Sequence, residues 1–305
     1  MRSRRMIAHD EFLRVVEPNG KALIFYSKID RLEQHLKELS PADGPLIDEF
    51  IHDMRFFSER TVPLSKPRNL MGPEELAQLG AGMLPYAAAM ARWAKISIAE
   101  FAGPFQDPFL RRALPSIFAP DAAMSSFFFF LPGLEHGDCG VPEGGSLEFA
   151  RAIEQRYLQL GGQVHYGCRV AKILIEPTGS AGDPACGRAV GIRLGHGREY
   201  HANTVVSAAD GHTTLFEMLE GRFVTDGWQG AYEKLPVWDP VVQVTLGVRR
   251  DLAAEPHWAV RLLDRPVTIG GRPRTLLPVR HFCYDPSLAP AGHSVVQTLL
   301  STDYR

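Results

Sequence analysis

Two adjacent glycines, Gly144 and Gly145, stand directly before a helical pattern over residues 146–160. Glycine lets a ligand approach the backbone closely, and the first N–H groups of a helix have no partner within the helix. Together these features suit a flat or anionic ligand. A tight turn that merely leads into the helix explains the same glycines, so both interpretations stay open.

A second candidate is the segment 205–210, which reads Val-Val-Ser-Ala-Ala-Asp. An apolar strand that ends in small residues is typical of the carboxyl edge of a parallel sheet, where cofactors bind. A core strand with a polar end is the alternative, and the segment alone favours neither.

Residues 135–139 bring carboxylate, imidazole and thiol groups close together in sequence. Adjacent residues rarely converge on one metal ion, so we favour a polar loop and expect no metal site. Glu135 and His136 as general acid and base are the alternative, and we assign no catalytic residue. The sequence has no G-x-S-x-G, G-x-x-x-x-G-K-[ST] or H-E-x-x-H motif, and its four cysteines form no C-x-x-C pair.

Helical patterns dominate the first half of the chain. Residues 12–16 and 22–26 predict an opening hairpin around Asn19-Gly20, a dipeptide that supplies the positive φ angles of a tight turn. Ser27 and Asp30 indicate a capping box for the helix that follows. Further helices are predicted from residue 41 and over residues 74–84, ending before Pro85. The apolar face of the helix after residue 41 comprises Leu46, Ile47, Phe50, Ile51, Met54 and Phe57.

Strand patterns dominate the second half, after the helix over residues 146–160. The predicted strands are residues 163–166, 169–176, 188–194, 199–207, 241–248 and 294–300. A loop rich in turn-forming residues, 178–184, joins the second and third of these strands.

Composition narrows the class of protein. The chain has 305 residues, 45% of them hydrophobic, which is enough for about two domains with a sizeable core. Its net charge of −2 argues against a nucleic-acid partner, because phosphate binding needs a basic excess. The cysteine pattern is typical of a reducing, cytoplasmic setting, and no apolar run is long enough to span a membrane.

Five blocks of sequence occur in a fixed order: residues 140–146 (Gly-Val-Pro-Glu-Gly-Gly-Ser), 160–162, 169–173, 187–192 and 205–210. In this order they resemble the flavin-dependent phytoene desaturase and carotenoid isomerase-like oxidoreductases of the flavin amine oxidase superfamily. The resemblance implies an α/β protein with a partial FAD/NAD(P)-binding, two-domain flavoprotein fold and a helical-plus-sheet substrate domain. It implies a mostly helical substrate domain at 1–139, the central part of the FAD-binding domain at 140–215, and the substrate-domain sheet at 216–305.

The resemblance also implies FAD as the cofactor. Val170 matches the residue whose backbone contacts the adenine side of FAD. Ala208 and Ala209 match the end of a segment that lies beside the diphosphate and ribose of FAD. Gly144 and Gly145 match a pair near the junction of flavin and substrate. The implied reaction is hydride transfer between flavin N5 and a carbon of an apolar polyene or isoprenoid.

The sequence also departs from the pattern of this superfamily. Its members begin with a strand, a G-x-G-x-x-G turn and a helix that hold the FAD diphosphate, and they end with a second glycine-rich flavin-contacting segment. This sequence has neither. We therefore expect a shortened or incomplete chain that binds FAD weakly or not at all by itself.

Two functions remain as hypotheses. The first is an FAD-dependent oxidoreductase of phytoene desaturase type, with an apolar small molecule as substrate. The phenylalanines of 127–130 would then either line an apolar substrate tunnel or belong to the core. The second is a non-catalytic module that binds an apolar ligand or partner and has lost the cofactor half. Peripheral membrane contact and association through open sheet edges stay open for both.

Overall fold

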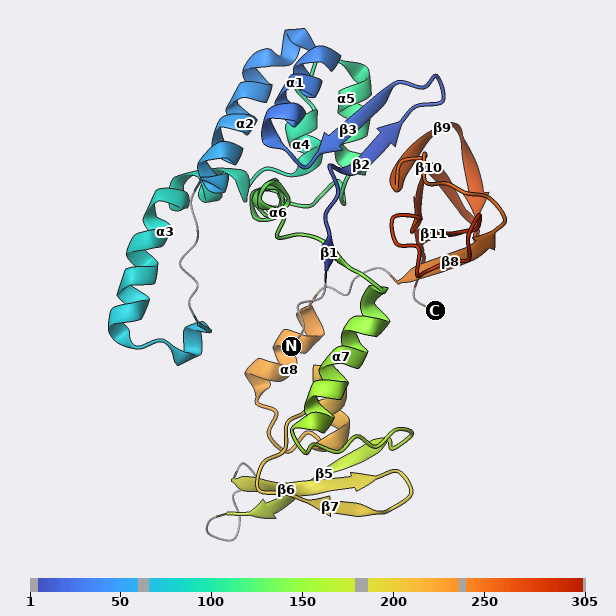
Figure 1. Ribbon diagram of the computed structural model, residues 1–305. Helices are drawn as coiled ribbons and strands as arrows, with labels where there is room; N and C mark the ends of the chain where they lie inside the picture. Colours follow the sequence, from blue (N-terminus) through green and yellow to red (C-terminus); the bar gives the residue numbers. More distant parts are fainter. Residues whose placement is uncertain (1–4, 60–65, 179–185, 236–239, 304–305) are drawn as a thin grey trace. The chain divides into compact units, whose positions relative to one another are not determined.

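The computed structural model in Figure 1 describes residues 5–59, 66–178, 186–235 and 240–303. The chain forms two compact units. Unit 1 comprises Met1–Ala152 and Pro240–Arg305, and unit 2 comprises Ile153–Asp239. The first boundary falls within one helix, α7 (Gly145–Gln159).

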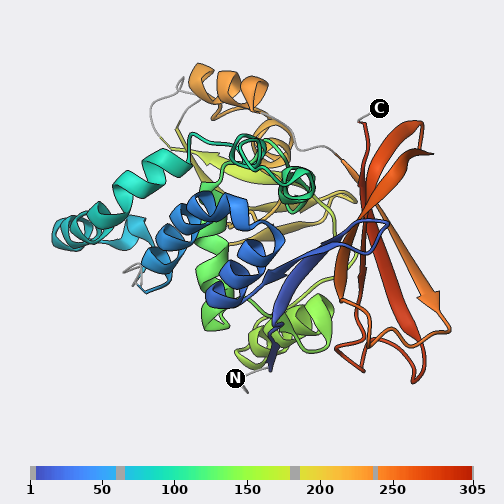
Figure 2. The same ribbon diagram turned by 90° about the horizontal axis from the view of Figure 1, so that it is seen from above.

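Unit 1 contains a six-stranded sheet of order β3-β2-β9-β10-β11-β8. Its strands are β2 (Glu11–Val16), β3 (Ala22–Tyr26), β8 (Val241–Val248), β9 (Trp258–Ile269), β10 (Arg272–His281) and β11 (Ser294–Ser301). Figures 1 and 2 show the opening hairpin, in blue, beside the orange and red strands. Every pairing is antiparallel except that of β2 with β9, which is parallel. The sheet thus joins the two ends of the chain, and the predicted hairpin and the strands at 241–248 and 294–300 are confirmed.

Sequence reasoning missed the hairpin of β9 and β10. Its turn is Gly270-Gly271, and both residues have positive φ, at 60° and 75°. Two consecutive positive φ angles are what a tight two-residue hairpin turn requires, and glycine adopts them without strain. A Gly-Gly pair between two strand-forming runs was therefore the available signal.

Helices cover the first half of unit 1, as predicted. They are α1 (Ile29–Leu39), α2 (Gly44–Ser58), α3 (Pro73–Trp93), α4 (Ile98–Ala102), α5 (Pro108–Ala113) and α6 (Ser125–His136), with short 3₁₀ turns at Pro41–Asp43, Arg68–Leu70 and Leu114–Ser116. The predicted end of α3 before Pro85 is wrong, because the helix continues to Trp93. Proline removes one backbone donor, and the buried Tyr86 and Trp93 hold the second half of α3 to the core.

Aromatic side chains make up much of the core of unit 1. Phe127 and Phe128 are each only 2% exposed, so the core interpretation holds for these two residues. The Phe127 ring centroid lies 5.5 Å from that of Phe25 and 5.1 Å from that of Phe118. The predicted face of α2 is buried too, apart from the partly exposed Leu46.

A short two-stranded pairing completes unit 1. β1 (Met6–Ile7) lies antiparallel to β4 (Val141–Pro142). The pairing places the chain just before Gly144 against the N-terminal segment. Glycine fits closely at position 140, because a Cβ atom there would make a tight contact of 3.0 Å with the Ile7 carbonyl oxygen.

Unit 2 is built on a three-stranded antiparallel sheet of order β5-β6-β7. Its strands are β5 (Val170–Pro177), β6 (Gly187–Leu194) and β7 (Glu199–His201), accompanied by the second half of α7, a π-helical turn at Thr213–Met218 and α8 (Asp226–Lys234). The predicted hairpin of 169–176 with 188–194 is confirmed. Its loop at 178–184 lies, apart from residue 178, outside the described residues.

Two strand predictions in unit 2 are wrong. Residues 163–166 form no strand, and the strand that starts at Glu199 ends at His201, so that 205–207 is not part of it. A strand needs a hydrogen-bonded neighbour, and no described strand pairs with either segment. Val206 is accordingly 85% exposed.

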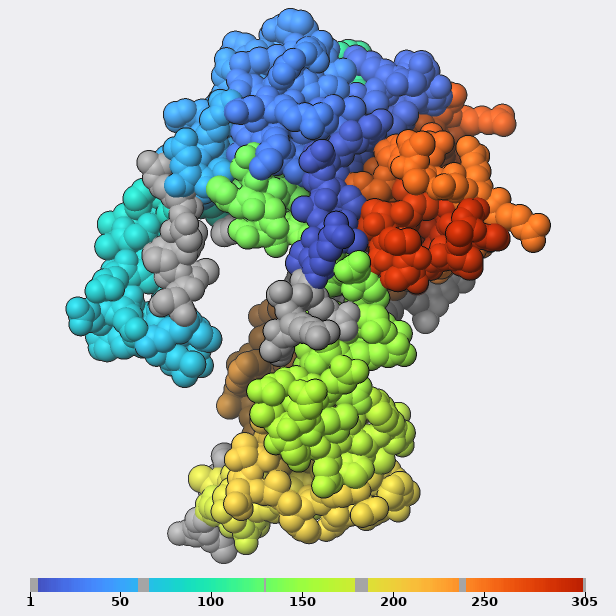
Figure 3. Space-filling view, viewed as in Figure 1, coloured from blue at the N-terminus to red at the C-terminus, as the bar shows by residue number. Residues whose placement is uncertain are grey.

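The apolar stripe of α7 is also exposed. The pattern of this helix predicts a buried face, yet none of its residues is buried. Figure 3 shows α7 in green on the molecular surface. Among all described residues, no helix combines the length and apolar character needed to cross a membrane.

Candidate cofactor and substrate sites

Unit 2 contains a cavity of about 370 Å³ beside its sheet. Three predicted FAD-binding residues, Val170, Ala208 and Ala209, line it together. The remaining walls come from the strands and from the segment that follows β7, namely Ile173, Gly191, Ile192, Tyr200, Ala202, Thr204, Val205, Val206, Ser207 and Met218. The structure thus brings together residues that lie almost 40 positions apart in sequence. We call this space the unit-2 cavity.

Hydrogen bonds fix the segment that carries Ala208 and Ala209. The Ser207 hydroxyl lies 2.8 Å from that of Thr214, and the Asp210 carboxylate accepts the Thr213 N–H at 2.8 Å. The Asp210 carbonyl oxygen accepts the Thr214 N–H at 2.9 Å. Residues 207–210 are therefore anchored to the π-helical turn, although they are not a strand.

The start of β5 is irregular where Val170 lies. The register of β5 against β6 shifts between Val170 and Lys172, so Ala171 has no partner residue in β6. A bulge of this kind leaves backbone groups outside the ladder. Val170, next to this shift, lines the unit-2 cavity, whereas Ala171 does not.

The glycine pair belongs to unit 1 and is not among the residues that line the unit-2 cavity. Gly144 and Gly145 have φ angles of 81° and 73°, which explains glycine at both positions. The N–H of Gly144 is not free for a ligand, because it donates to the Asp285 carboxylate at 2.6 Å. The turn is therefore held by a buried acid from the other end of the chain.

Asp285 is only 2% exposed and also accepts the backbone N–H of Ser287 at 3.0 Å and its hydroxyl at 2.6 Å. Burial alone would raise the pKa of Asp285, but these bonds and the one from Gly144 together hold it below its ordinary value. An ionised Asp285 thus ties the glycine pair to the segment after β10.

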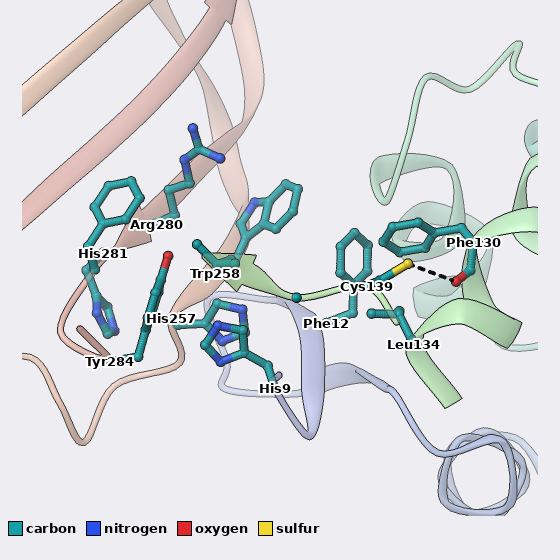
Figure 4. A pocket seen from close by; sticks show the side chains of 13 residues that line it. His9, Phe12, Phe130, Leu134, Cys139, His257, Trp258, Arg280, His281 and Tyr284 are labelled. Atoms are coloured by element: carbon teal, nitrogen blue, oxygen red, sulfur yellow. Dashed lines mark hydrogen bonds between the residues drawn. The ribbon is translucent and has the colours of Figure 1, made fainter. Parts of the chain in front are cut away.

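Unit 1 contains a second cavity, of about 410 Å³, which we call the unit-1 cavity. Figure 4 shows its two ends. Phe12, Phe130, Leu134 and Trp258 form an apolar end, in which the ring of Phe12 lies 4.5 Å from that of Phe130 and 5.1 Å from that of Trp258. One phenylalanine of the 127–130 run therefore lines a cavity, whereas Phe127 and Phe128 belong to the core.

The other end of the unit-1 cavity is polar. His9 and His257 stack with ring centroids 3.9 Å apart, and Tyr284 meets His9 edge-on at 4.5 Å. Burial, together with repulsion from His9 and His281, lowers the pKa of His257 to about 4, and burial also lowers the pKa of His9. Both rings are therefore uncharged at neutral pH.

Sequence reasoning missed this group, because its members are single residues in separate elements. His9 precedes β2, His257 precedes β9, and Arg280, His281 and Tyr284 lie at and beyond the end of β10. Predicting the hairpin of β9 and β10 would have placed His257 near the end of β10, since Trp258 pairs with Arg280.

The acid and base candidates at 135–136 have structural roles. The Glu135 carboxylate accepts the Ile29 N–H at 2.7 Å, and His136 Nε2 lies 2.7 Å from the Ser58 carbonyl oxygen. Burial raises the pKa of the Cys139 thiol. Within the described parts of the chain, no group of three or more His, Cys, Asp or Glu side chains could hold a metal ion.

Comparison with known proteins was made on sequence and on structure. A family model described as flavin containing amine oxidoreductase matches residues 78–305. A chloroplastic prolycopene isomerase from Arabidopsis thaliana is 26% identical over 120 residues, which are 38% of this chain and 18% of that protein. Prolycopene isomerase 2 from an Oncidium hybrid cultivar is 26% identical over 172 residues, or 52% of this chain and 26% of that protein.

The chain thus spans about a fifth to a quarter of the length of the curated relatives it matches. A solved Rab GDI from Plasmodium falciparum superposes with a TM-score of 0.44 at 6% identity, covering 99% of this chain and 62% of that one.

Proposed function

The chain belongs to the flavin containing amine oxidoreductase family, and from this premise we propose that it acts in an FAD-dependent oxidoreductase of phytoene desaturase type. Its substrate would be an apolar polyene or isoprenoid. Family membership supports a mixed α/β flavoprotein and favours an oxidoreductase over a non-catalytic binding module. The similarity to prolycopene isomerases supports a carotenoid-like substrate.

One observation carries the proposal: Val170, Ala208 and Ala209, expected to contact FAD, line a single cavity. The fit of that cavity to the adenine side rests on its mostly apolar walls and on the register shift beside Val170 at the start of β5. We propose that the backbone at Val170 binds the adenine edge and that Ala208 and Ala209 let the ribose and diphosphate pass close to the chain. When bound, FAD would supply the hydride acceptor or donor.

In this proposal the substrate binds in the unit-1 cavity. This cavity falls within the usual size range of small-molecule sites, about 300–1,000 Å³, and its aromatic walls suit a conjugated chain. The hydrogen bond from Gly144 to Asp285 fixes the backbone of the glycine pair. We propose that this fixed turn lies at the junction of flavin and substrate.

An FAD titration of the full chain tests the proposal, with flavin fluorescence as the signal. Ala208→Leu adds bulk to the unit-2 cavity and should weaken FAD binding about tenfold or more, because a few displaced contacts amount to about 1.4 kcal/mol. Ala231→Leu, at an exposed position of α8 in the same unit, is the matched control.

We expect weak, saturable binding that only Ala208→Leu reduces. Equal affinities of the two variants would contradict the assignment of the cavity. An absence of saturable FAD binding would contradict the proposal that this chain binds FAD in the unit-2 cavity by itself.

A further inference from the structure

Arg280 is a half-buried cation at the polar end of the unit-1 cavity. Its Nε donates to the Gln297 side-chain oxygen at 2.6 Å, and its guanidinium lies 5.6 Å from the Phe282 ring centroid. These two contacts fix the orientation of the group. No described carboxylate forms an ion pair with Arg280, and its two terminal nitrogens have no hydrogen-bond acceptor among the described residues.

Tyr284 offers a second donor at the same end. Its hydroxyl has no hydrogen-bond partner among the described residues, and Figure 4 draws it on the side of Arg280. Burial raises the pKa of Tyr284, so the hydroxyl keeps its proton at neutral pH. The end of the cavity therefore presents a fixed cation and a neutral O–H donor.

The neighbouring groups do not cancel this charge. His9 and His257 are uncharged at neutral pH, and both ring nitrogens of His281 contact backbone groups, at Glu255 and Cys283. The nearby acids are engaged elsewhere: Asp285 by Ser287 and Gly144, and Glu11 by Arg14 at 2.6 Å and 2.7 Å.

We propose that the unit-1 cavity binds an apolar polyene or isoprenoid that ends in a carboxylate, with Arg280 and Tyr284 holding the carboxylate. A planar guanidinium matches the two oxygens of a carboxylate, and a cation beside apolar walls favours an anion over a neutral end group. The apolar tail contacts Phe12, Phe130 and Trp258. The inference rests on the proposed function only for the class of the tail and adds a charged end group to it.

A matched pair of probes tests the proposal without flavin. All-trans-retinoic acid and all-trans-retinol carry the same polyene and differ in the end group. Binding to the full chain is followed by quenching of tryptophan fluorescence, to which Trp258 in the cavity wall contributes. We expect the acid to bind about tenfold or more tightly than the alcohol, the size of one charge-assisted hydrogen-bonded pair.

Variants assign the preference to the two side chains. Arg280→Gln should bring the affinity for the acid down to that for the alcohol, and Tyr284→Phe should weaken acid binding about threefold to tenfold. Arg261→Gln, at an exposed position of β9 outside the cavity, should leave both affinities unchanged. Circular dichroism checks that each variant is folded.

The outcomes separate this inference from the proposed function. Equal binding of acid and alcohol, or an acid preference that survives Arg280→Gln and Tyr284→Phe, overturns the carboxylate site but leaves an apolar substrate intact. An Arg280-dependent preference in a protein that binds no FAD supports the carboxylate site and contradicts FAD binding in the unit-2 cavity by this chain alone.

Discussion

The two units differ in how they bury apolar surface. In unit 1 a continuous cluster runs through the sheet and helices α1 to α6, with many side chains fully buried. In unit 2 the only described hydrophobic side chains that are buried are Ile173, 6% exposed, and Leu194, 3% exposed. A packed core holds side chains in defined positions, whereas a sheet with few buried contacts opens more easily.

This contrast separates the two cavities. The walls of the unit-1 cavity come from residues packed on the core, such as Phe12 and Trp258, which touch it directly. The segment of the unit-2 cavity that carries Ala208 and Ala209 is exposed and held mainly by polar bonds. A ligand that binds only the folded form stabilises it by an amount set by its concentration relative to its Kd, so FAD should stabilise unit 2 and a polyene carboxylate should stabilise unit 1.

The largest expected effect comes from one substitution made in both units. Leu110→Ala in α5, at a side chain that is 0% exposed, should lower the free energy of unfolding of unit 1 by about 2–5 kcal/mol, because it leaves a cavity in a packed core. Leu160→Ala in unit 2, at a side chain that is 68% exposed, should change stability by less than about 0.5 kcal/mol. Amide hydrogen exchange in β9 reports on unit 1, and exchange in β5 reports on unit 2. Equal losses of stability in the two variants would contradict the difference between the units.

The next largest expected effect is a dependence of the stability of unit 1 on pH. The pKa of His257 is about 4 in the folded state and 6.5 ordinarily, so the unfolded chain binds more protons between these values. The uncharged His257 therefore costs unit 1 no stability above about pH 6.5, and unit 1 is progressively destabilised as the pH falls toward 4. The whole shift corresponds to about 3 kcal/mol. Because the ring is partly exposed, we expect a loss of about 1–2 kcal/mol at pH 5.

His257→Phe provides the control for this dependence. It keeps an aromatic ring stacked on His9 but removes the titrating group. Urea unfolding at pH 7 and pH 5, followed by amide hydrogen exchange in β9, should show a smaller loss of stability than in the wild-type chain. An unchanged loss would assign the effect to His9 and His35, whose pKa values burial also lowers. The carboxylates of Glu11, Asp43 and Asp285 have lowered pKa values and titrate below this window.

A pair of glycines tests the sheets directly. A Cβ atom at Gly191 in β6 would lie 2.2 Å from the Tyr200 carbonyl oxygen of β7, so Gly191→Ala must move the strands apart. We expect a loss of about 1–3 kcal/mol in unit 2. Gly247→Ala in β8 meets nothing within 4 Å and should stay within about 0.5 kcal/mol. Amide hydrogen exchange in β6 measures the effect of Gly191→Ala, and exchange in β8 measures that of Gly247→Ala. An unchanged stability in Gly191→Ala would show that β7 is not held against β6.

Local patterns allowed much of unit 1 to be predicted from sequence. The apolar stripe of α2 and the Asn19-Gly20 turn specify elements that bury a face against neighbours near in sequence. The prediction failed where the outcome depends on distant partners. Segment 205–207 has the composition of a buried strand, but it has no described neighbour with which to pair.

The candidate sites divide in the same way. The sequence blocks identified Val170, Ala208 and Ala209, and the structure places them around one cavity. The polar end of the unit-1 cavity depends on strand register, which brings His257 and Arg280 together across a hairpin that was not predicted. Single histidines and arginines carry no local pattern, so only the folded chain reveals them.

The smallest expected effect concerns the start of α1, where a capping box from Ser27 and Asp30 was predicted and is wrong. Ser27 donates its hydroxyl to the His9 carbonyl oxygen at 2.5 Å instead, and the cap residue, Lys28, makes no side-chain bond to the helix. Glu135, more than 100 residues away in sequence, accepts the Ile29 N–H in its place.

Glu135→Ala should therefore lower the stability of unit 1 by about 1 kcal/mol, the usual cost of losing a cap. The control is Asp138→Ala, at an exposed position three residues further along the chain, which should change the stability by less than about 0.5 kcal/mol. Because this role is structural, FAD affinity at a pH where the variant is folded should stay unchanged. A drop in FAD affinity without a loss of stability would instead place Glu135 at the flavin site.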